Sequence, residues 1–454
     1  MGLSIVILAA GQGTRMRSSS PKVLQPLAGR PMLSHVIECS KALGASDICV
    51  VYGFGGDAVR AAFSQENIRW ALQQEQLGTG HAVRQAMPGT PDDNRVLILF
   101  GDVPLLRRDT LQKVIDACGK DEVAVLTVDQ DDPTGYGRIV RENGRVVRNV
   151  EEKDANEAER AIREINTGVQ TMPAAKLKAW LSRLGNDNSQ GEYYLTDVLE
   201  MAVADGIQVH GVKADSMVEV MGINDRKQLA GAERALQSRL VDELMKKGVS
   251  FADPARVDIR GKLECGQDVF IDVNAVFEGN VTLGDKVRIE SNNVIRDSRI
   301  GAGTVIHPNC HIEGAGLGPD CEIGPFARLR PGAELASHVK VGNFVEIKKS
   351  TVADGSKVNH LTYIGDATIG KNVNIGAGTI TCNYDGANKY RTTIGDNAFI
   401  GSGVELVAPV EVGAGAVIGA GSTISKDAPP DQLTLERSRQ TTVPGWKRPT
   451  KKSH

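Results

Sequence analysis

Residues 394–425 read IGDNAFIGSGVELVAPVEVGAGAVIGAGSTIS and carry an aliphatic residue at every sixth position. Four of the six aliphatic residues in this register are followed by glycine, and the set is Ile394, Ile400, Leu406, Val412, Ile418 and Ile424. A period of six matches neither the helical period of 3.6 nor simple strand alternation. It fits one inward aliphatic residue on each flat side of a coil, so three sides predict a coil of roughly 18 residues.

Two earlier stretches follow the same rule, at Ile300, Ile306 and Ile312 and from Leu317 to Ile347. The span 252–427 therefore predicts a parallel β-helix of roughly ten coils. A β-sandwich would instead show strands at irregular spacings of roughly 8 to 12 residues. The pattern IGAGTV, IGSGVE and VGAGAV resembles the hexapeptide repeat of left-handed β-helix proteins. Many of those are acyltransferases that work as trimers and some are structural, so the repeat alone only suggests the chemistry.

The register breaks once, between Ile375 and Ile394, where residues 379–393 read TITCNYDGANKYRTT. This insertion is too long for one more hexad. Insertions in a solenoid become loops on one face, often the functional face. We therefore expect an exposed loop in which Asn383, Tyr384 and Tyr390 reach a ligand or a neighbouring chain.

The N-terminal half opens with the apolar run SIVILAA (4–10), the glycine turn GQGTRM (11–16) and SSSPKVL (18–24). This order predicts a buried strand followed by a turn whose backbone N–H groups cradle a phosphate or a base edge. It is not the dinucleotide fingerprint, because Met16 stands where a third glycine belongs, and the GK[ST] of a P-loop is absent. Arg15 and Lys22 supply two cations suited to a polyphosphate.

A second apolar run, VLILF (96–100), ends at Asp102. Ligands of open α/β sheets bind at the carboxyl ends of strands, which places this carboxylate where it can hold Mg²⁺. A cap of a turn or helix is the alternative reading of the same aspartate. Position alone does not decide between the two.

Composition narrows the class of protein. The chain has 454 residues, 41% of them hydrophobic, and a net charge of −3, so nothing points to nucleic acid or an anionic membrane as a partner. No apolar stretch is long enough to span a bilayer. The seven cysteines are scattered, so we expect neither disulfides nor a zinc site, His307, Cys310 and His311 included, and we expect a cytoplasmic protein.

LAAGQGTRM, PKVL, QLGTGHA and GDVPL together closely resemble the nucleoside-diphosphate-sugar pyrophosphorylases. With the hexapeptide half attached, the chain resembles the bacterial bifunctional N-acetylglucosamine-1-phosphate uridyltransferases and glucosamine-1-phosphate N-acetyltransferases. The resemblance covers nearly the whole chain and includes GYGRIV, EEKDA, EINTG, GINDR, RLRPGA, EIKKS, NHLTYIGD and NIGAGTITCNYDG. It implies synthesis of UDP-N-acetylglucosamine, the precursor of peptidoglycan and lipopolysaccharide.

We expect an α/β protein with three parts: a Rossmann-like uridyltransferase domain over 1–226, a linker helix over 227–247 and a left-handed β-helix acetyltransferase domain over 248–454. The linker reads KQLAGAERALQSRLVDELMKK. One apolar helical stripe runs along it through Leu229, Ala232, Leu236, Leu240 and Leu244. Asp225 with Gln228 resembles a capping box at its start, and Gly248 is placed to cap its end.

For uridyl transfer, the resemblance implies a small-molecule site that takes UTP and N-acetylglucosamine 1-phosphate, with Mg²⁺ as cofactor. The nucleotide and sugar contacts fall on Leu8, Ala9, Ala10, Gly11, Lys22, Gln73, Gly78, Thr79, Phe100, Gly101, Asp102, Gly137, Glu151, Asn166 and Asn224. Asp102 and Asn224 would bind the metal, and Arg15 and Lys22 would face the triphosphate. Phe100 stands where many members have tyrosine, which matters only if its side chain is used.

For acetyl transfer, the resemblance implies glucosamine 1-phosphate and acetyl-CoA as substrates and a homotrimer as the working form. His360 is the expected general base, oriented by Glu346, and an imidazole with an ordinary pKa of about 6.5 suits the task. Arg330, Lys348, Tyr363 and Asn374 would bind the sugar phosphate, and Ala377, Asn383, Tyr384, Ser402, Ala420 and Arg437 would bind acetyl-CoA.

Two other readings remain at this point. One is a monofunctional pyrophosphorylase whose β-helix only oligomerises or regulates. The other is a non-enzymatic scaffold, such as the nucleotide-exchange subunits of translation initiation. NHLTYIGD and the CNYDG loop favour acetyl transfer, and the intact GQGTRM, PKVL and GD motifs disfavour a scaffold.

Overall fold

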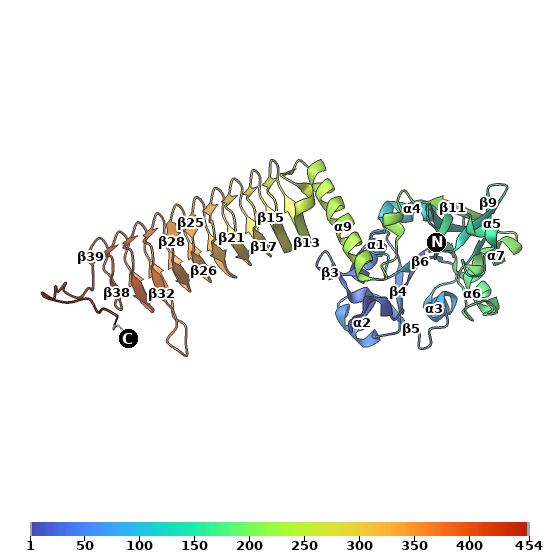
Figure 1. Cartoon of the computed structure of the whole chain (residues 1–454), viewed down its shortest axis with the longest axis horizontal. Coiled ribbons are helices and arrows are strands. Elements are labelled where there is room, and N and C mark those ends of the chain that lie inside the picture. The colour runs from blue at the N-terminus through green and yellow to red at the C-terminus, as the bar shows by residue number, and fades with distance from the viewer. Residues whose placement is uncertain (1, 452–454) are drawn as a thin grey trace. The chain divides into compact units, whose positions relative to one another are not determined.

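A computed structural model describes residues 2–451 of the chain. Its internal contacts divide the chain into two compact units, and the division falls between Leu236 and Gln237 (Figure 1). Within the described residues, no helix is both long and apolar enough to cross a membrane.

The first unit is built on one mixed sheet whose main path runs β11-β7-β10-β6-β1-β4-β5. Its strands are β1 (Leu3–Ala9), β4 (Asp47–Tyr52), β5 (Arg69–Leu72), β6 (Arg95–Phe100), β7 (Val123–Asp129), β8 (Arg138–Glu142), β9 (Arg145–Val150), β10 (Glu164–Pro173) and β11 (Val209–Lys213). β1 lies between β4 and β6 and is parallel to both, whereas β10 is antiparallel to β6 and β7. The hairpin of β8 and β9 joins at β10, and a small ribbon pairs β2 (Pro26–Leu27) with β3 (Arg30–Pro31).

Helices cover both faces of this sheet because β1, β4 and β6 are apolar on both sides. On one face, Val6 and Ile98 pack with α3 (Thr79–Ala86), α6 (Ala174–Arg183) and α7 (Asp197–Ala204). On the other face, Ile5 and Ile7 pack with α1 (Met32–Ala42), α2 (Gly56–Ala62) and α4 (Arg108–Asp116). Two short helices, α5 (Glu157–Arg160) and α8 (Met217–Val220), complete the unit. Because β1 and β6 are parallel neighbours, their carboxyl ends lie side by side at one edge of the sheet, as the two buried runs predict.

The expected linker helix is α9 (Arg226–Lys246). Its start is capped twice, because the Asp225 carboxylate accepts from the Gln228 N–H at 2.8 Å and the Gln228 side chain accepts from the Asn224 N–H at 2.7 Å. Gly248, with a φ of 98°, follows its end as expected. Glu233 accepts from the Ala28 N–H at 2.7 Å within the first unit. The Gln237 side chain donates to the Ile259 carbonyl at 2.8 Å and accepts from the Ile259 N–H at 2.7 Å within the second unit, so the helix contributes to both units.

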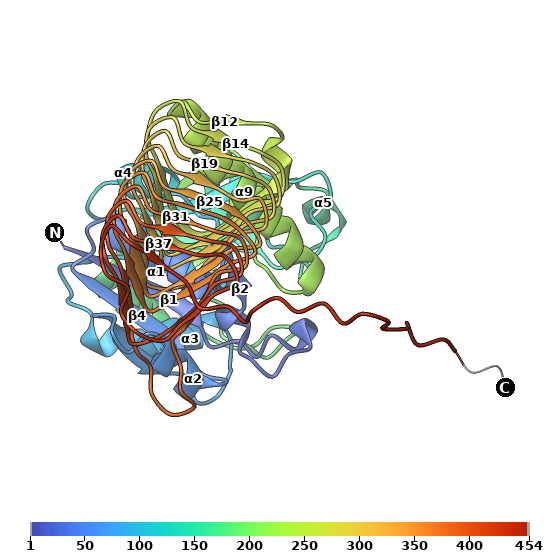
Figure 2. The same ribbon diagram turned by 90° about the vertical axis from the view of Figure 1, so that its left-hand side faces the viewer.

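The second unit is a parallel β-helix, as the period of six predicts. One side of the coils is a sheet of β12 (Ser250–Phe251), β14 (Phe270–Ile271), β16 (Arg288–Ile289), β19 (Val305–Ile306), β22 (Glu322–Ile323), β25 (Lys340–Asn343), β28 (Lys357–His360), β31 (Asn374–Ile375), β34 (Phe399–Ile400), β37 (Val417–Ile418) and β39 (Leu433–Thr434). Pairing between successive strands of this side is parallel throughout. Seen along the unit, the coils superimpose on one another (Figure 2).

The other sides of the coils form one continuous sheet. Its strands are β13 (Val257–Cys265), β15 (Ala275–Leu283), β17 (Val294–Arg296), β18 (Arg299–Ile300), β20 (His311–Glu313), β21 (Gly316–Leu317), β23 (Arg328–Leu329), β24 (Ala333–Leu335), β26 (Glu346–Lys348), β27 (Ser350–Val352), β29 (Tyr363–Gly365), β30 (Ala367–Ile369), β32 (Ile380–Cys382), β33 (Thr392–Ile394), β35 (Glu405–Val407), β36 (Val410–Val412) and β38 (Thr423–Ile424).

The aliphatic residues of the repeat form a single continuous core. All six that define the register at 394–424 are no more than 3% exposed. Apart from the coil that carries the insertion, successive coils are 17 or 18 residues long, as the offsets between stacked residues show, so some coils lack one residue of the expected 18. In the coil that ends at β27, the missing residue falls between β26 and β27, and the inward residues Ile347 and Val352 still pair with Leu329 and Leu335.

The predicted break in the register is a loop between β32 and β33 that projects from the coils (Figure 1). Tyr384 is 59% exposed and Tyr390 is 38% exposed, as expected of this loop. Asn383 differs from the expectation, because it is only 7% exposed at the loop's base. Its side-chain amide donates to the Asp366 carboxylate at 2.5 Å, which holds it against the coils.

Candidate functional site

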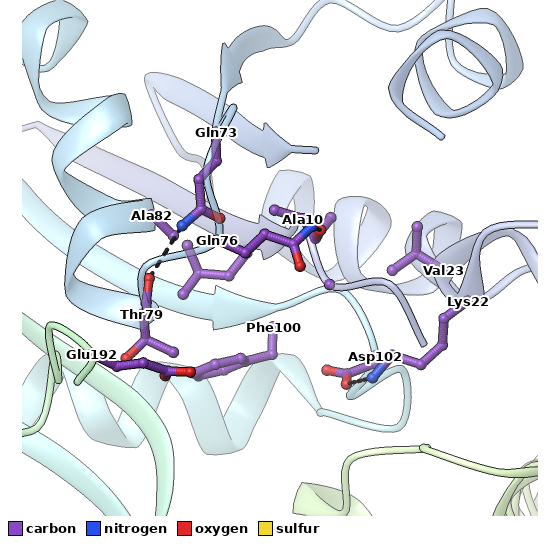
Figure 3. Close-up of a pocket in the computed structure, with 14 residues that line it drawn as sticks. Ala10, Lys22, Val23, Gln73, Gln76, Thr79, Ala82, Phe100, Asp102 and Glu192 are labelled. Carbon is purple, nitrogen blue, oxygen red and sulfur yellow. Dashed lines mark hydrogen bonds and ion pairs between the residues drawn. The ribbon is translucent and has the colours of Figure 1, made fainter. Parts of the chain in front are cut away.

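A cavity of about 300 Å³ opens at the edge of the first sheet where β1 and β6 end (Figure 3). Its lining contains ten of the residues predicted for the nucleotide, namely Leu8, Ala9, Ala10, Gly11, Lys22, Gln73, Gly78, Thr79, Phe100 and Asp102. The predicted Gly101 lies at the same edge and donates its N–H to the Leu8 carbonyl at 2.9 Å. Arg15 is exposed in the turn Thr14–Met16 and is not part of this lining.

One end of the cavity is formed by amide side chains and the start of α3. The Gln73 side chain donates to the Gly78 carbonyl at 3.2 Å, and the Gln76 side chain donates to the Ala10 carbonyl at 2.8 Å. The Thr79 hydroxyl accepts from the Leu195 N–H at 3.1 Å, which fixes the first turn of the helix. Gly78 precedes the helix with a φ of 105°, and a Cβ there would lie 2.7 Å from the Tyr193 carbonyl oxygen, so the position requires glycine.

Lys22, Asp102 and Asn224 meet at the other end of the cavity, although 202 residues separate the first from the last. The Lys22 ammonium forms an ion pair with the Asp102 carboxylate and donates to the Asn224 Oδ1 at 3.1 Å (Figure 3). The side-chain oxygens of Asp102 and Asn224 therefore both contact one positive charge, the Lys22 ammonium. The Asp102 carbonyl accepts from the Ile223 N–H at 2.9 Å, which ties the segment after β6 to the segment before α9.

A second cavity of about 160 Å³ shares Phe100 and Asp102 with the first. Asn166, predicted for the sugar, lines it together with Tyr136 and Met217. The Phe100 ring packs on Gly168, where an added Cβ would lie 2.5 Å from a ring carbon. Phe100 lines both cavities, and its ring lies against Gly168.

The other predicted sugar residues lie close to Asn166. The Asn166 N–H donates to the Gly137 carbonyl at 2.9 Å, and a Cβ on Gly137 would lie 2.6 Å from the Asn149 side chain. Asn149 donates to the Glu151 carboxylate at 3.0 Å, and Thr196 donates to the same oxygen at 3.1 Å. Burial, reinforced by the Glu151 charge, raises the pKa of the neighbouring Asp197 to about 6.

Sequence reasoning did not select Gln76, Val23, Ala82 and Glu192, which also line the first cavity. Gln76 and Ala82 are the first and last residues of the quoted motif QLGTGHA, so the motif itself was the available signal. Glu192 lies more than a hundred residues away along the chain, and no local pattern marks it.

The second unit brings four predicted residues, His360, Ala377, Ser402 and Ala420, into one column with Asn343, which was not predicted. Asn343, His360, Ala377, Ser402 and Ala420 hold the same position at one corner of five successive coils. Four equivalent hydrogen bonds define the column: Leu361 N–H to Asn343 O at 3.1 Å, Gly378 N–H to His360 O at 3.3 Å, Gly403 N–H to Ala377 O at 2.7 Å and Gly421 N–H to Ser402 O at 2.8 Å. We call this set the corner column. On the C-terminal side of His360 the members of the column are small, namely Ala377, Ser402 and Ala420, and they leave a shallow strip along the corner.

The predicted sugar-phosphate residues lie on the adjoining side of the coils. Arg330 donates to Glu346 at 2.8 Å, and this bond raises the pKa of the arginine. Glu346 stacks beside Tyr363 in the register of β26 and β29, and Lys348 follows it by two residues. Lys389 of the loop lies close enough to Lys348 to lower its own pKa, so the loop adds a cation to this group.

Glu346 was expected to orient His360, but the structure gives both residues other partners. Glu346 accepts from Arg330 and lies 3.8 Å from a second arginine, Arg328. The Nδ1 atom of His360 lies 2.9 Å from the Oδ1 atom of Asn343. The orienting role of Glu346 stays a prediction.

The remaining predicted residues are spread around the column. Asn374 occupies β31, between Lys357 and Phe399 in register. Tyr384 is exposed at the loop. Arg437 is exposed, and its Cδ lies 3.9 Å from where a Cβ of Gly421 would stand, so it lies beside the end of the corner column.

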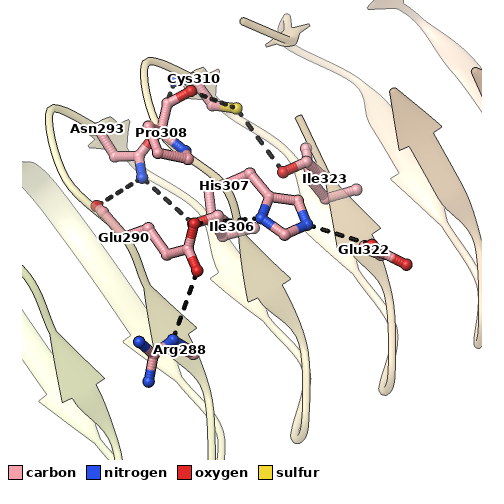
Figure 4. A network of polar contacts seen from close by, with 9 residues as sticks. All are labelled: Arg288, Glu290, Asn293, Ile306, His307, Pro308, Cys310, Glu322 and Ile323. Carbon is pink, nitrogen blue, oxygen red and sulfur yellow. Dashed lines mark hydrogen bonds and ion pairs between the residues drawn. The ribbon is translucent and has the colours of Figure 1, made fainter. Parts of the chain in front are cut away.

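HPNCH does not assemble a metal site. His307 bridges two carboxylates, with 3.2 Å from Nδ1 to Glu290 and 3.2 Å from Nε2 to Glu322 (Figure 4). Cys310 is buried, where its pKa rises to about 11, and His311 faces outward from the next strand. Nowhere in the described residues do three or more histidine, cysteine or acidic side chains gather as a metal would require.

Comparison with known proteins assigns both halves. Residues 5–170 match the MobA-like NTP transferase domain, and residues 391–426 match the bacterial transferase hexapeptide family of six repeats. "Bifunctional protein GlmU" of Aromatoleum aromaticum is 59% identical over 99% of both chains. Its counterpart in Azoarcus sp. is 58% identical over 99% of this chain and all of that one, and the one in Acinetobacter baumannii is 54% identical over 99% of both.

The two matched families lie in the two compact units, one in each. Identity that high extends over 99% of the chain, so the resemblance covers both units. The expected α/β nucleotidyltransferase and hexapeptide β-helix are both confirmed. The chain therefore belongs to the family of bifunctional GlmU proteins and is an enzyme with uridyltransferase and acetyltransferase activities.

Proposed function

We propose that UTP and N-acetylglucosamine 1-phosphate react in the two joined cavities of the first unit. The observation that carries this proposal is that ten residues implied by the family resemblance line one cavity. Gln73, Gln76 and the start of α3 offer polar groups to the base, and Lys22 offers charge to the phosphates. The sugar takes the second cavity, beyond Phe100 and beside Asn166.

In this reaction the phosphate of the sugar attacks the α-phosphorus of UTP and pyrophosphate leaves. The attacking phosphate is already anionic, so the site needs no strong base. It needs to hold both substrates in line and to neutralise the charge of the leaving pyrophosphate. Lys22 lines the first cavity, and its ammonium group is the cation that would neutralise this charge.

Asp102 and Asn224 are the residues we propose for Mg²⁺. Their fit is supported by the donor set, one carboxylate and one amide oxygen, and by their convergence on a cation, the Lys22 ammonium. Mg²⁺ prefers such oxygen ligands and fills its remaining positions with water and substrate phosphates. When bound, it would supply charge to the phosphates, while Lys22 turns from the two ligands toward the triphosphate.

Acetyl transfer is proposed at the corner column of the second unit, with His360 as general base. Arg330 and Lys348 bind the phosphate of glucosamine 1-phosphate, and Tyr363 and Asn374 hold the sugar. Acetyl-CoA lies along Ala377, Ser402 and Ala420, with Asn383, Tyr384 and Arg437 at its edges. The small side chains of the column support this placement, because a pantetheine arm needs an unobstructed strip.

We further propose a homotrimer in the cytoplasm. Phe326, Phe344 and Leu361 are 50%, 56% and 62% exposed on three successive turns, and the two phenyl rings stack at 5.4 Å. An exposed apolar ladder of this kind favours burial against a second copy of the chain. The seven free cysteines support a reducing compartment.

Separate assays on the purified chain test the division of labour. We expect release of CoA thiol from glucosamine 1-phosphate and acetyl-CoA alone. Pyrophosphate release should need N-acetylglucosamine 1-phosphate, UTP and Mg²⁺. Pyrophosphate without any thiol release would instead support a monofunctional pyrophosphorylase with a structural β-helix.

A further inference from the structure

We infer that Asn343 is a positioning residue for acetyl transfer, because its amide oxygen holds the Nδ1 side of the His360 imidazole. The inference rests on the proposed role of His360 as the base. The two side chains stand one coil apart, 17 residues along the chain, with 2.9 Å between Oδ1 and Nδ1. Asn343 and His360 are partners in the register of β25 and β28.

The backbone around this pair leaves little freedom. The Asn343 carbonyl accepts from the Leu361 N–H at 3.1 Å, directly after His360. The His360 carbonyl accepts from the Thr362 hydroxyl at 2.6 Å and from the Gly378 N–H at 3.3 Å. Thr362 is buried. The side-chain contact is therefore set by bonds to the coils on both sides, as a positioning contact must be.

The contact decides which ring nitrogen is free. A neutral imidazole carries one N–H, and the nitrogen that carries it is set by the partner of the other. An amide oxygen accepts, so Asn343 keeps the proton on Nδ1 and leaves the lone pair of Nε2 unprotonated. In the opposite tautomer Nε2 would carry the proton and could not act as a base.

The reaction then balances as follows. The amine of glucosamine 1-phosphate attacks the thioester carbon, and Nε2 of His360 takes the proton that the amine loses. The new C–N bond forms, the C–S bond breaks, and the CoA thiolate leaves and receives that proton. Throughout, Nδ1–H remains donated to Asn343.

The corner column gives the pair its direction. Asn343 stands on one side of His360 and Ala377 on the other. The bulky partner blocks the N-terminal side of the imidazole, and the methyl side chain leaves the C-terminal side open. Because Nδ1 points toward Asn343, we place Nε2, on the other side of the ring, toward the strip proposed for acetyl-CoA.

Asn343→Leu tests the inference, because leucine keeps the size of asparagine and lacks the acceptor. We expect kcat of acetylation to fall by about 10- to 100-fold, the scale seen when the partner that orients a metal-bound histidine is lost, with both KM values nearly unchanged. Asn343→Asp, whose carboxylate only accepts, should restore most of kcat. Asn280→Leu, an exposed asparagine on β15, is the matched control and should behave as the parent.

Each outcome separates the inference from its premise. A full rate in His360→Ala would overturn the base itself. An inactive His360→Ala with a full rate in Asn343→Leu would overturn the positioning role and leave the base intact. Equal losses in the Asp and Leu variants would also overturn it, since an acceptor alone would then not suffice. If Asn343→Leu lowers the thermal midpoint, Asn343→Ala carries the same comparison.

Discussion

The two units build their sites by opposite means. In the first unit, Lys22, Asp102 and Asn224 come from three distant segments that the sheet edge gathers. In the second, the corner column repeats one position on successive coils, so neighbours in space are 17 or 18 residues apart, or more where the loop intervenes. A sheet edge concentrates unlike chemistry at one point, whereas a solenoid spreads a long binding strip. The two regions should therefore respond differently to the same kind of change.

The largest contrast should come from replacing glycine by alanine in each unit. A Cβ on Gly342 would lie 2.0 Å from the backbone oxygen of Asn359, and the next coil has no room to yield. We expect Gly342→Ala to cost about 3 kcal/mol of stability or more and to lower acetyl transfer at least tenfold. Thermal denaturation and the thiol assay measure this, and uridyl transfer should stay within twofold. A neutral Gly342→Ala would mean that the coils slide more freely than their register indicates.

Gly168→Ala makes the same change in the first unit. Its φ is 82°, and the added methyl would meet the Phe100 ring, a side chain that is able to turn. The expected cost is therefore smaller, about 1 to 3 kcal/mol. Because Phe100 lines both cavities, KM for the sugar phosphate should rise in the pyrophosphate assay. Unchanged kinetics would show that the position of the ring does not matter to the substrates.

A change that fills the strip should affect binding alone. Ala377→Leu places a larger side chain beside His360 in the corner column. We expect KM for acetyl-CoA to rise by about tenfold, the scale of an overpacked contact of 1 to 3 kcal/mol, with little change in KM for glucosamine 1-phosphate. Ala414→Leu, at an exposed corner away from the column, is the control. Equal effects of the two variants would place acetyl-CoA elsewhere.

The smallest effect should be a dependence on pH in the first unit alone. Folding raises the pKa of Asp197 from 3.8 to about 6, so its charged form is penalised in the folded state. The native state then holds more protons than the unfolded state between these values, and stability falls as the pH rises through them. Asp197→Asn should raise the thermal midpoint at pH 7.5 and change it little at pH 4. A larger gain at pH 4 would have the wrong sign.

The same contrast explains which features of the two units could be predicted from the sequence. Ile394 and Ile400 mark their coil by spacing alone, and both are buried as predicted. Asp102 was locatable because a buried strand ends there, but the bond that brings Asn224 to Lys22 spans 202 residues and leaves no local trace. Only the family resemblance pointed to that pairing.

Asn343 was not predicted, although the repeat itself places it beside His360. Val341 and Val358 pair in the register of β25 and β28. Asn343 and His360, each two residues further along the chain, therefore pair as well. The expected coil of 18 residues hid this, because the coil between them has 17. Asn383 was predicted to be exposed in the loop, but it is buried. Spacing along the sequence does not reveal the hydrogen bond to Asp366 that holds it against the coils.

The central claim is that two separate sites share one chain, and crossing two variants against two assays tests it most directly. Asp102→Ala should abolish pyrophosphate release and leave thiol release near that of the parent. His360→Ala should lower thiol release by about 10² to 10⁴, the range of a lost general base, and leave pyrophosphate release from supplied N-acetylglucosamine 1-phosphate unchanged. Equal loss of both activities in either folded variant would contradict the account.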